Sequence, residues 1–228
     1  MTTLMIGLQG SVPALSLFML ANSILPGPNN LMLLHGGIKR GFWACRGHMM
    51  GVTTGVIIML WLSYWGIAQI VVEHPQVMLS IKILGSLYLL WLTWQMAKTD
   101  FIAVVKKALY QESLDKTSTA NPDKKGFGDL PLTFWQALML QGLNPKAWTI
   151  TMIAPTLAMI SLGLAEATPW LDNWSLLLLC AVINVTSIGW WAAGGQWLRK
   201  LVDYPRVMKG IHSVIVLMTF YCALSLWL

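Results

Sequence analysis

The fold is decided by a stretch without Lys, Arg, Asp or Glu at residues 1–38, which reads MTTLMIGLQGSVPALSLFMLANSILPGPNNLMLLHGGI. A membrane span needs about 20 apolar residues, because the hydrocarbon core is about 30 Å thick and a helix rises about 1.5 Å per residue. The stretch is therefore long enough to cross a membrane but too long for one straight helix. It is interrupted by the segment Leu25-Pro26-Gly27-Pro28-Asn29-Asn30, since proline removes backbone donors and glycine permits unusual dihedral angles.

Similar runs without these four residue types continue along the chain, at 47–72, 74–81, 83–97, 130–145, 147–165, 173–198 and 210–228. Only 11% of the residues are charged and the mean hydropathy is +0.63, whereas ordinary globular domains carry roughly 25% charged residues. A closed β-barrel would show alternating segments of about ten residues, so long continuous runs favour helices. We predict an all-α membrane protein with six transmembrane helices, near 4–25, 47–72, 76–97, 145–163, 173–197 and 208–228.

The positions of Lys and Arg predict the orientation, because positively charged loops stay on the cytoplasmic side. Basic residues follow the first, third and fifth predicted spans: Lys39, Arg40, Arg46, Lys98, Lys106, Lys107, Lys116, Lys124, Lys125, Arg199, Lys200, Arg206 and Lys209. The loops near 73–74 and 164–172 contain no Lys or Arg. Both termini should therefore lie outside the cytoplasm. The first run lacks a basic segment ahead of it, so we expect a span and not a cleaved signal peptide. The net charge of +6 follows from this topology, and we expect no nucleic-acid partner.

The predicted spans divide into two groups of three, at 1–97 and 132–228, joined by a basic cytoplasmic linker at 98–131. An odd number of crossings in each half turns the second half upside down relative to the first, as in inverted-repeat transporters. The second half also contains an interruption, Leu143-Asn144-Pro145-Lys146. Broken backbone at membrane depth is tolerated only where protein or a water-filled cavity surrounds it. The alternative interpretation is that each break is a turn at the membrane surface.

Several motifs together resemble the LysE/RhtB superfamily of bacterial amino-acid exporters. They are the segment Pro26-Gly27-Pro28-Asn29-Asn30, the basic Lys39-Arg40-Gly41, the glycines from Gly47 to Gly55, and Asn144-Pro145-Lys146-Ala147. The form of the first motif, with residues 87–94 (LYLLWLTW) and Tyr221-Cys222-Ala223, is similar to the branch that exports cysteine and O-acetylserine. The resemblance implies secondary efflux of small amino acids across the bacterial inner membrane, with H+ as the expected coupling ion.

One departure from this superfamily bears on the mechanism. Some members carry an acidic residue inside a span, whereas all nine Asp and Glu of this chain fall in loops or at the ends of the predicted spans. An intramembrane carboxylate is therefore not the expected proton carrier. Its absence also disfavours a site for a cationic side chain, so we expect small neutral substrates or their derivatives, of the cysteine, O-acetylserine, homoserine or threonine type.

The two breaks are the predicted substrate site. A helix that restarts after a break presents unpaired N–H groups and the positive end of its dipole, both of which bind carboxylates. Lys146 would add a full charge, and the asparagines would offer side-chain amides. The predicted substrate-binding residues are Pro26, Gly27, Pro28, Asn29, Asn30, Asn144, Pro145 and Lys146. Lys82, in contrast, lies near the predicted outer interface, and its long stem can extend to water.

Other polar residues in the predicted spans are compatible with more than one role. His35, His48 and His212 lie near span ends, where a lone histidine is most often a hydrogen-bonding surface residue. Asn184, Gln141 and Gln95 could either line a path or join helices, and the sequence does not separate these roles. The glycines at 47, 51 and 55 share one helix face and predict close packing of a neighbouring helix.

No enzyme is expected, because the predicted spans contain neither a paired carboxylate nor a His/Cys cluster that could bind a metal. The cysteines at 45, 180 and 222 are unclustered, and we expect no cofactor. The sequence therefore favours a secondary transporter for a small amino acid in a lipid bilayer, and it is compatible with a homo-oligomer. The alternative is a channel or a helical assembly partner. A carrier would saturate with substrate, and a channel would not.

Overall fold

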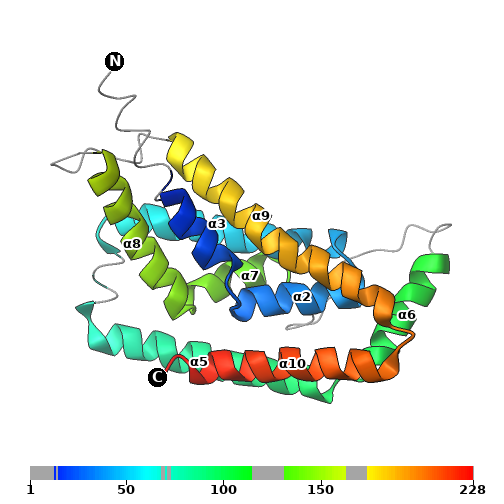
Figure 1. Ribbon diagram of the computed structural model, residues 1–228. Helices are drawn as coiled ribbons and strands as arrows, with labels where there is room; N and C mark the ends of the chain where they lie inside the picture. The colour runs from blue at the N-terminus through cyan, green and yellow to red at the C-terminus, as the bar shows by residue number, and fades with distance from the viewer. Residues whose placement is uncertain are drawn as a thin grey trace.

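The computed structural model describes residues 13, 15–67, 70, 73–114, 131–162 and 174–227. Every regular element within these residues is helical (Figure 1). The elements are a short helix Leu15–Ile24, α2 Pro28–Arg40, α3 Arg46–Tyr64, α5 Pro75–Lys98, α6 Phe101–Leu114, α7 Phe134–Gly142, α8 Pro145–Leu162, α9 Trp174–Leu198 and α10 Pro205–Leu224, with 3₁₀ turns at Trp43–Cys45 and Arg199–Leu201. The predicted all-α class is confirmed.

Four of these helices are long and apolar enough to cross a membrane, namely Trp43–Ser63, Pro75–Lys98, Leu176–Leu201 and Pro205–Leu224. They correspond to the predicted spans at 47–72, 76–97, 173–197 and 208–228. The other two predicted spans, at 4–25 and 145–163, lie partly outside the described residues. Residues 115–130 and 163–173, which contain much of the basic linker and one predicted outer loop, also lie outside them.

The second predicted span is too long at its C-terminal end. Helix α3 ends at Tyr64, and Gly66 has a φ of 74°, in the left-handed region that glycine adopts without a steric penalty. Its N–H bonds to the Ser63 carbonyl at 3.0 Å. This is a common way for a helix to end. The charge-free run at 47–72 therefore extends beyond the end of α3, so the absence of charged residues did not mark where this helix ends.

Both predicted breaks are present. Residues 25–27 separate the short helix from α2, and residues 143–144 separate α7 from α8. Pro28 and Pro145 are the first residues of the new helices. Proline suits this position because the N–H that it lacks would have no partner within the helix. In Figure 1 each break lies between two helical pieces in the middle of the bundle.

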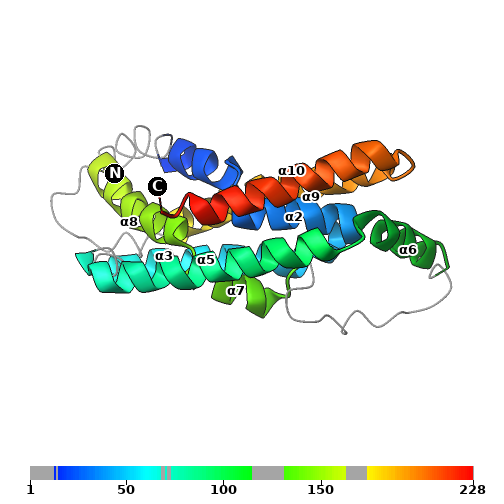
Figure 2. The ribbon, with the colours of Figure 1, turned by 90° about the horizontal axis from the view of Figure 1, so that it is seen from below.

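Helix α2 is the most enclosed element. It packs closely against α9 and also contacts α10, α6 and α3. Leu31, Met32, Leu33 and Ile38 are fully buried in its core cluster. Figure 2 shows α5 and α10 side by side along one edge of the bundle, with α2 behind them. The helix after the first break is thus held by α9 and α10 from the second half of the chain and also by α3 and α6.

The predicted packing role of the small residues in α3 is confirmed. A methyl group at Gly51 would overlap the Phe134 carbonyl, and one at Gly55 would lie 2.7 Å from the Gln141 side chain. These glycines let α7 pack directly on the α3 backbone. The close contact brings the last turn of α7, which ends at the second break, against the middle of α3.

A helix that the sequence did not predict lies in the described part of the linker at 98–131. Helix α6 starts after Asp100, whose carboxylate accepts a hydrogen bond from the Ala103 N–H at 3.1 Å. Phe101 and Val105, one helical turn apart, are buried in the main core cluster. The start of the linker is therefore part of the packed bundle.

Candidate functional site

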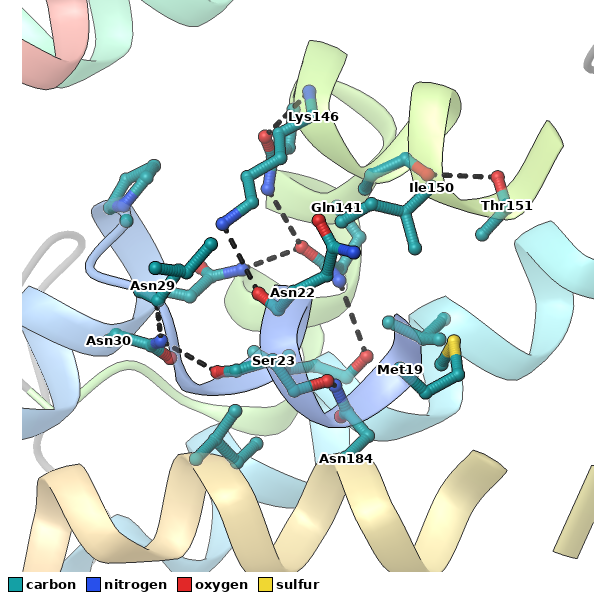
Figure 3. A pocket seen from close by; sticks show the side chains of 18 residues that line it. Met19, Asn22, Ser23, Asn29, Asn30, Gln141, Lys146, Ile150, Thr151 and Asn184 are labelled. Atoms are coloured by element: carbon teal, nitrogen blue, oxygen red, sulfur yellow. Dashed lines mark hydrogen bonds between the residues drawn. The ribbon is translucent and has the colours of Figure 1, made fainter. Parts of the chain in front are cut away.

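The two breaks lie against each other at the position of Lys146. Its ammonium Nζ donates a hydrogen bond to the Asn22 carbonyl at 3.2 Å, in the last turn before the first break. A Cβ placed on Gly27 would be only 3.7 Å from the same nitrogen. The positively charged side chain of Lys146, in the first turn of α8, therefore extends to the first break. Figure 3 shows this side chain directed toward Asn22 and Asn29.

Gln141, in the last turn of α7, joins the two breaks by hydrogen bonds. Its Oε1 accepts from Asn29 Nδ2 at 2.6 Å and from Asn144 Nδ2 at 3.4 Å. Its own amide nitrogen donates to the Val52 carbonyl at 3.5 Å, which fixes the orientation of the amide. Gln141 is only 3% exposed. Gln141 lines the first cavity and also joins helices by its hydrogen bonds. It therefore has both of the roles between which the sequence could not decide.

Two cavities flank the Gly27–Lys146 contact. The first has a volume of about 60 Å³ and the second about 90 Å³, which is room for several water molecules or one small solute. Five predicted residues line both of them: Gly27, Pro28, Asn29, Asn144 and Lys146. Asn30 lines the first cavity, and Pro26 and Pro145 line the second. All eight predicted residues thus come together.

The asparagines at the breaks differ in what they can offer a ligand. Asn30 Nδ2 donates to the carbonyls of Ser23 and Leu25, each at 2.8 Å, and so holds the end of the preceding helix. Asn144 Oδ1 accepts a hydrogen bond from the Lys146 N–H at 3.2 Å. This N–H at the start of α8 is therefore already paired, whereas we predicted unpaired N–H groups there. Both side chains therefore stabilise the breaks themselves.

Asn29 is different, because one of its polar atoms is unused. Its Nδ2 is bonded to Gln141, and its Oδ1 is buried without a hydrogen-bond partner. The residue is 8% exposed and lines both cavities. A buried acceptor without a donor is costly, and such groups usually indicate a missing partner. A ligand that carries an N–H group would satisfy this oxygen.

The charge of the site is positive. Among the described residues that line the two cavities none is acidic, and Lys146 is the cation that they share. The N-terminal ends of α2 and α8 add their positive dipole ends at the same place. A carboxylate is the complementary group for this combination.

The wall of the first cavity contains a polar network that the sequence did not resolve. Asn184, on α9, donates to Ser23 Oγ at 3.2 Å, and its Oδ1 accepts from the Thr53 hydroxyl at 3.0 Å. These bonds join the short first helix to α3 and α9. Asn184 was one of three polar residues with an open role, whereas Gln95 is exposed and lines neither cavity.

The second cavity is more apolar and extends to the last helix. Its walls include Leu89, Leu140, Leu143 and Leu226, together with Cys222 and Ser225 at the end of α10. Cys222 was noted as part of a family motif and as one of three unclustered cysteines, and no spacing rule would have placed it in one cavity with Lys146. Both side chains line the second cavity, and only the tertiary fold brings residues 146 and 222 together.

The expectation that the histidines are surface residues is wrong for two of them. His35 is 3% exposed and His48 is fully buried, and neither lines the two cavities. His35 lies near the end of a helix in sequence, but that helix is the enclosed element α2. Lys82 is partly exposed on α5 and lines neither cavity.

A bundle of apolar helices that encloses a polar, charged site between two broken helices has the architecture of a secondary transporter. A family model, described as LysE type translocator, matches residues 20–228. The chain belongs to the LysE type translocator family. It is therefore a membrane transporter and not an enzyme.

The similarity to individual proteins is modest but covers almost the whole chain. The cysteine/O-acetylserine efflux proteins of Escherichia coli O157:H7 and of Escherichia coli strain K12 are each 24% identical to it over 210 residues. The match covers 92% of this chain and 94% of each relative. No solved structure matches significantly. The resemblance that the motifs indicated is confirmed at the level of the family.

Proposed function

We propose that this protein exports small neutral amino acids or their derivatives, of the cysteine, O-acetylserine, homoserine or threonine type, from the bacterial cytoplasm in exchange for protons. The observation that carries the proposal is that the same two residues line both small cavities. They are Lys146, which supplies a cation, and Asn29, whose buried Oδ1 has no hydrogen-bond partner. The names of the E. coli relatives support the substrate class.

An α-amino acid fits this pair with one orientation. Its carboxylate would bind Lys146 Nζ close to the positive dipole ends of α2 and α8, and its ammonium group would donate to Asn29 Oδ1. The two cavities, of about 60 and 90 Å³, favour a small side chain. Because none of the described lining residues is acidic, a cationic side chain would be desolvated without a counter-charge.

The packing of the helices supports two inverted repeats, at 1–97 and 132–228. Exchanging the halves exchanges α2 with α8 and α3 with α9. Helix α2 packs on α9, and correspondingly α8 packs on α3. The pairs α3–α9 and α5–α10 each join equivalent helices. In two inverted repeats of this kind the breaks would lie on the repeat interface, which is where inverted-repeat transporters bind substrate. With the basic linker in the cytoplasm, both termini lie outside.

Counterflow in proteoliposomes tests the proposed function. Vesicles loaded with unlabelled O-acetylserine or homoserine should take up the labelled compound transiently above equilibrium, and the initial rate should saturate with concentration. This follows because a carrier exchanges bound substrate across one site. Vesicles that contain the same protein but are loaded with lysine or arginine should give little counterflow of lysine or arginine.

Protein-free vesicles provide the background for this measurement. A rate that rises linearly with concentration would indicate a channel, and efficient counterflow of lysine or arginine with none of the neutral compounds would contradict the substrate class. The effect of a pH gradient on net uptake tests the coupling ion separately.

A further inference from the structure

Two imidazole rings with buried nitrogens, His35 and the partly buried His212, lie at one end of the bundle, away from the proposed substrate site. His35 is on α2, His212 is on α10, and Phe101 at the start of α6 packs against both of them. The Phe101 ring stacks on His212 with 4.6 Å between centroids and an interplanar angle of 14°. It also contacts His35 at 4.7 Å, and the two imidazoles are 5.7 Å apart. Helices α2, α6 and α10 are in mutual contact here.

The ring nitrogens of this pair are poorly satisfied. Neither nitrogen of His35 or of His212 makes a hydrogen bond of ordinary geometry, although all four are buried. The backbone of Met96 on α5 is a polar group near His212, but it makes no hydrogen bond of ordinary geometry with the ring nitrogens. Buried polar atoms without partners are rare and call for an explanation. A proton, with the water or carbonyl that would accompany it, is the simplest missing partner.

The electrostatic surroundings allow the pair to hold one positive charge at most. The charged or titratable groups that act on His35 are His212 and the cation Lys39 of its own helix. The other charged side chains described on α2, α6 and α10 and in the segments 98–100 and 199–204 are the partly exposed Arg40, the exposed Lys98, Asp100, Lys106, Lys107, Lys200, Asp203, Arg206 and Lys209, and the buried Arg199; His48 on α3 is also buried. No acidic side chain among the described residues is buried there, so a second proton would meet a like charge without compensation.

Both helices that carry the pair also reach the proposed substrate site. On α2, His35 follows Asn29 by six residues, which is about 9 Å along a helix. On α10, His212 precedes Cys222 by ten residues, or about 15 Å. A change at the α2–α10 contact would therefore move elements that line the two cavities. Coupling between two sites requires structural elements that contact both of them, and α2 and α10 are such elements here.

We propose that the His35–His212 pair is the site that binds the coupled proton. In this structure both rings are packed against Phe101, and all four ring nitrogens are shielded from solvent. Protonation of one ring requires hydration, so it biases the protein toward a conformation in which α10 separates from α2 and α6. One proton binds to a ring nitrogen from the outer side and leaves to the cytoplasm as one substrate molecule is exported. This inference rests on the proposed function and names residues for its coupling step.

The test separates exchange from proton-driven accumulation in proteoliposomes, with the membrane potential held at zero. Acid-inside vesicles of the wild-type protein should accumulate labelled homoserine, and a pH difference of about one unit can drive up to about tenfold accumulation per proton. His35→Gln and His212→Phe, which keeps the stack on Phe101, should show counterflow within about twofold of wild type but accumulation close to one. His74→Gln, at an exposed histidine, is the matched control and should behave as wild type.

Each outcome decides between specific claims. Proton-driven accumulation that survives in both variants overturns the assignment. Loss of counterflow in His212→Phe also overturns it, because the pair would then be needed for substrate binding or for folding. If wild-type protein shows counterflow but no pH-driven accumulation, coupling by this pair is excluded while the exporter proposal stands. If wild type shows no counterflow at all, the proposed function itself fails.

Discussion

Lys146→Met is expected to weaken substrate binding by roughly ten- to a hundred-fold, since a hydrogen bond to a charged group contributes about 1.5–3 kcal/mol and about 1.4 kcal/mol corresponds to tenfold. Methionine nearly conserves the length of the side chain but removes the charge that would face the carboxylate. The substrate concentration that gives half-maximal counterflow measures this effect. Lys146→Arg, which keeps a positive charge, should retain more of the affinity.

The matched control is Lys82→Met on α5. Lys82 is partly exposed and lines neither cavity, so we expect a change of less than about twofold. The Lys146 variant must insert normally, because its ammonium group also bonds to the Asn22 carbonyl and helps to hold the two breaks together. A normally inserted Lys146→Met protein with the wild-type saturation curve would remove Lys146 from the site.

Gly27→Leu should reduce transport by about a hundred-fold or more. Gly27 has a φ of −160° and a ψ of 173°, extended values that any residue adopts, so the backbone itself is not strained by the change. The effect comes from space, because the added side chain would start 3.7 Å from Lys146 Nζ and extend between the two cavities. Overpacking of this kind costs about 1–3 kcal/mol even without a ligand, and the substrate would lose its place beside the lysine.

Two further glycine substitutions show whether the loss depends on the size and position of the side chain. Gly27→Ala places its Cβ at an ordinary contact distance from Lys146, so it should transport at a rate between those of wild type and Gly27→Leu. Gly142→Leu makes the same replacement beside the second break, where nothing lies within 4 Å of an added Cβ, and it should be tolerated. Equal losses for Gly27→Leu and Gly142→Leu would indicate a general disturbance of folding.

The sequence predicted the parts of this site that depend on local backbone chemistry. Proline at positions 26, 28 and 145 forces a helix to end and another to start, and this holds whatever surrounds the chain. The positions of both breaks and the close packing of the α3 glycines were therefore predictable. The particular hydrogen bonds were not, because Lys146 and Asn22 are 124 residues apart and Asn29 and Gln141 are 112 apart.

Burial depth was the main source of error. His35 lies close to a basic segment in sequence, which suggested the membrane surface, but α2 is enclosed by α9, α10 and α6. Helix α6 was missed for a related reason, since the charged residues that follow Phe101 and Val105 obscure the short apolar spacing of these two buried side chains. Periodicity describes one helix at a time and does not report which neighbours cover it.

Substrate protection of Cys222 tests the location of the site most directly. Cys222 is partly exposed and lines the second cavity beside Lys146, whereas Cys45 and Cys180 are buried, so it is the native thiol best placed to report on the site. We expect saturating homoserine to suppress the reaction of this thiol with N-ethylmaleimide, with half-protection at the concentration that half-saturates counterflow. In Lys146→Met the protection should need roughly ten- to a hundred-fold more homoserine. An alkylation rate of Cys222 that stays unchanged at saturating homoserine would contradict a substrate site between the two breaks.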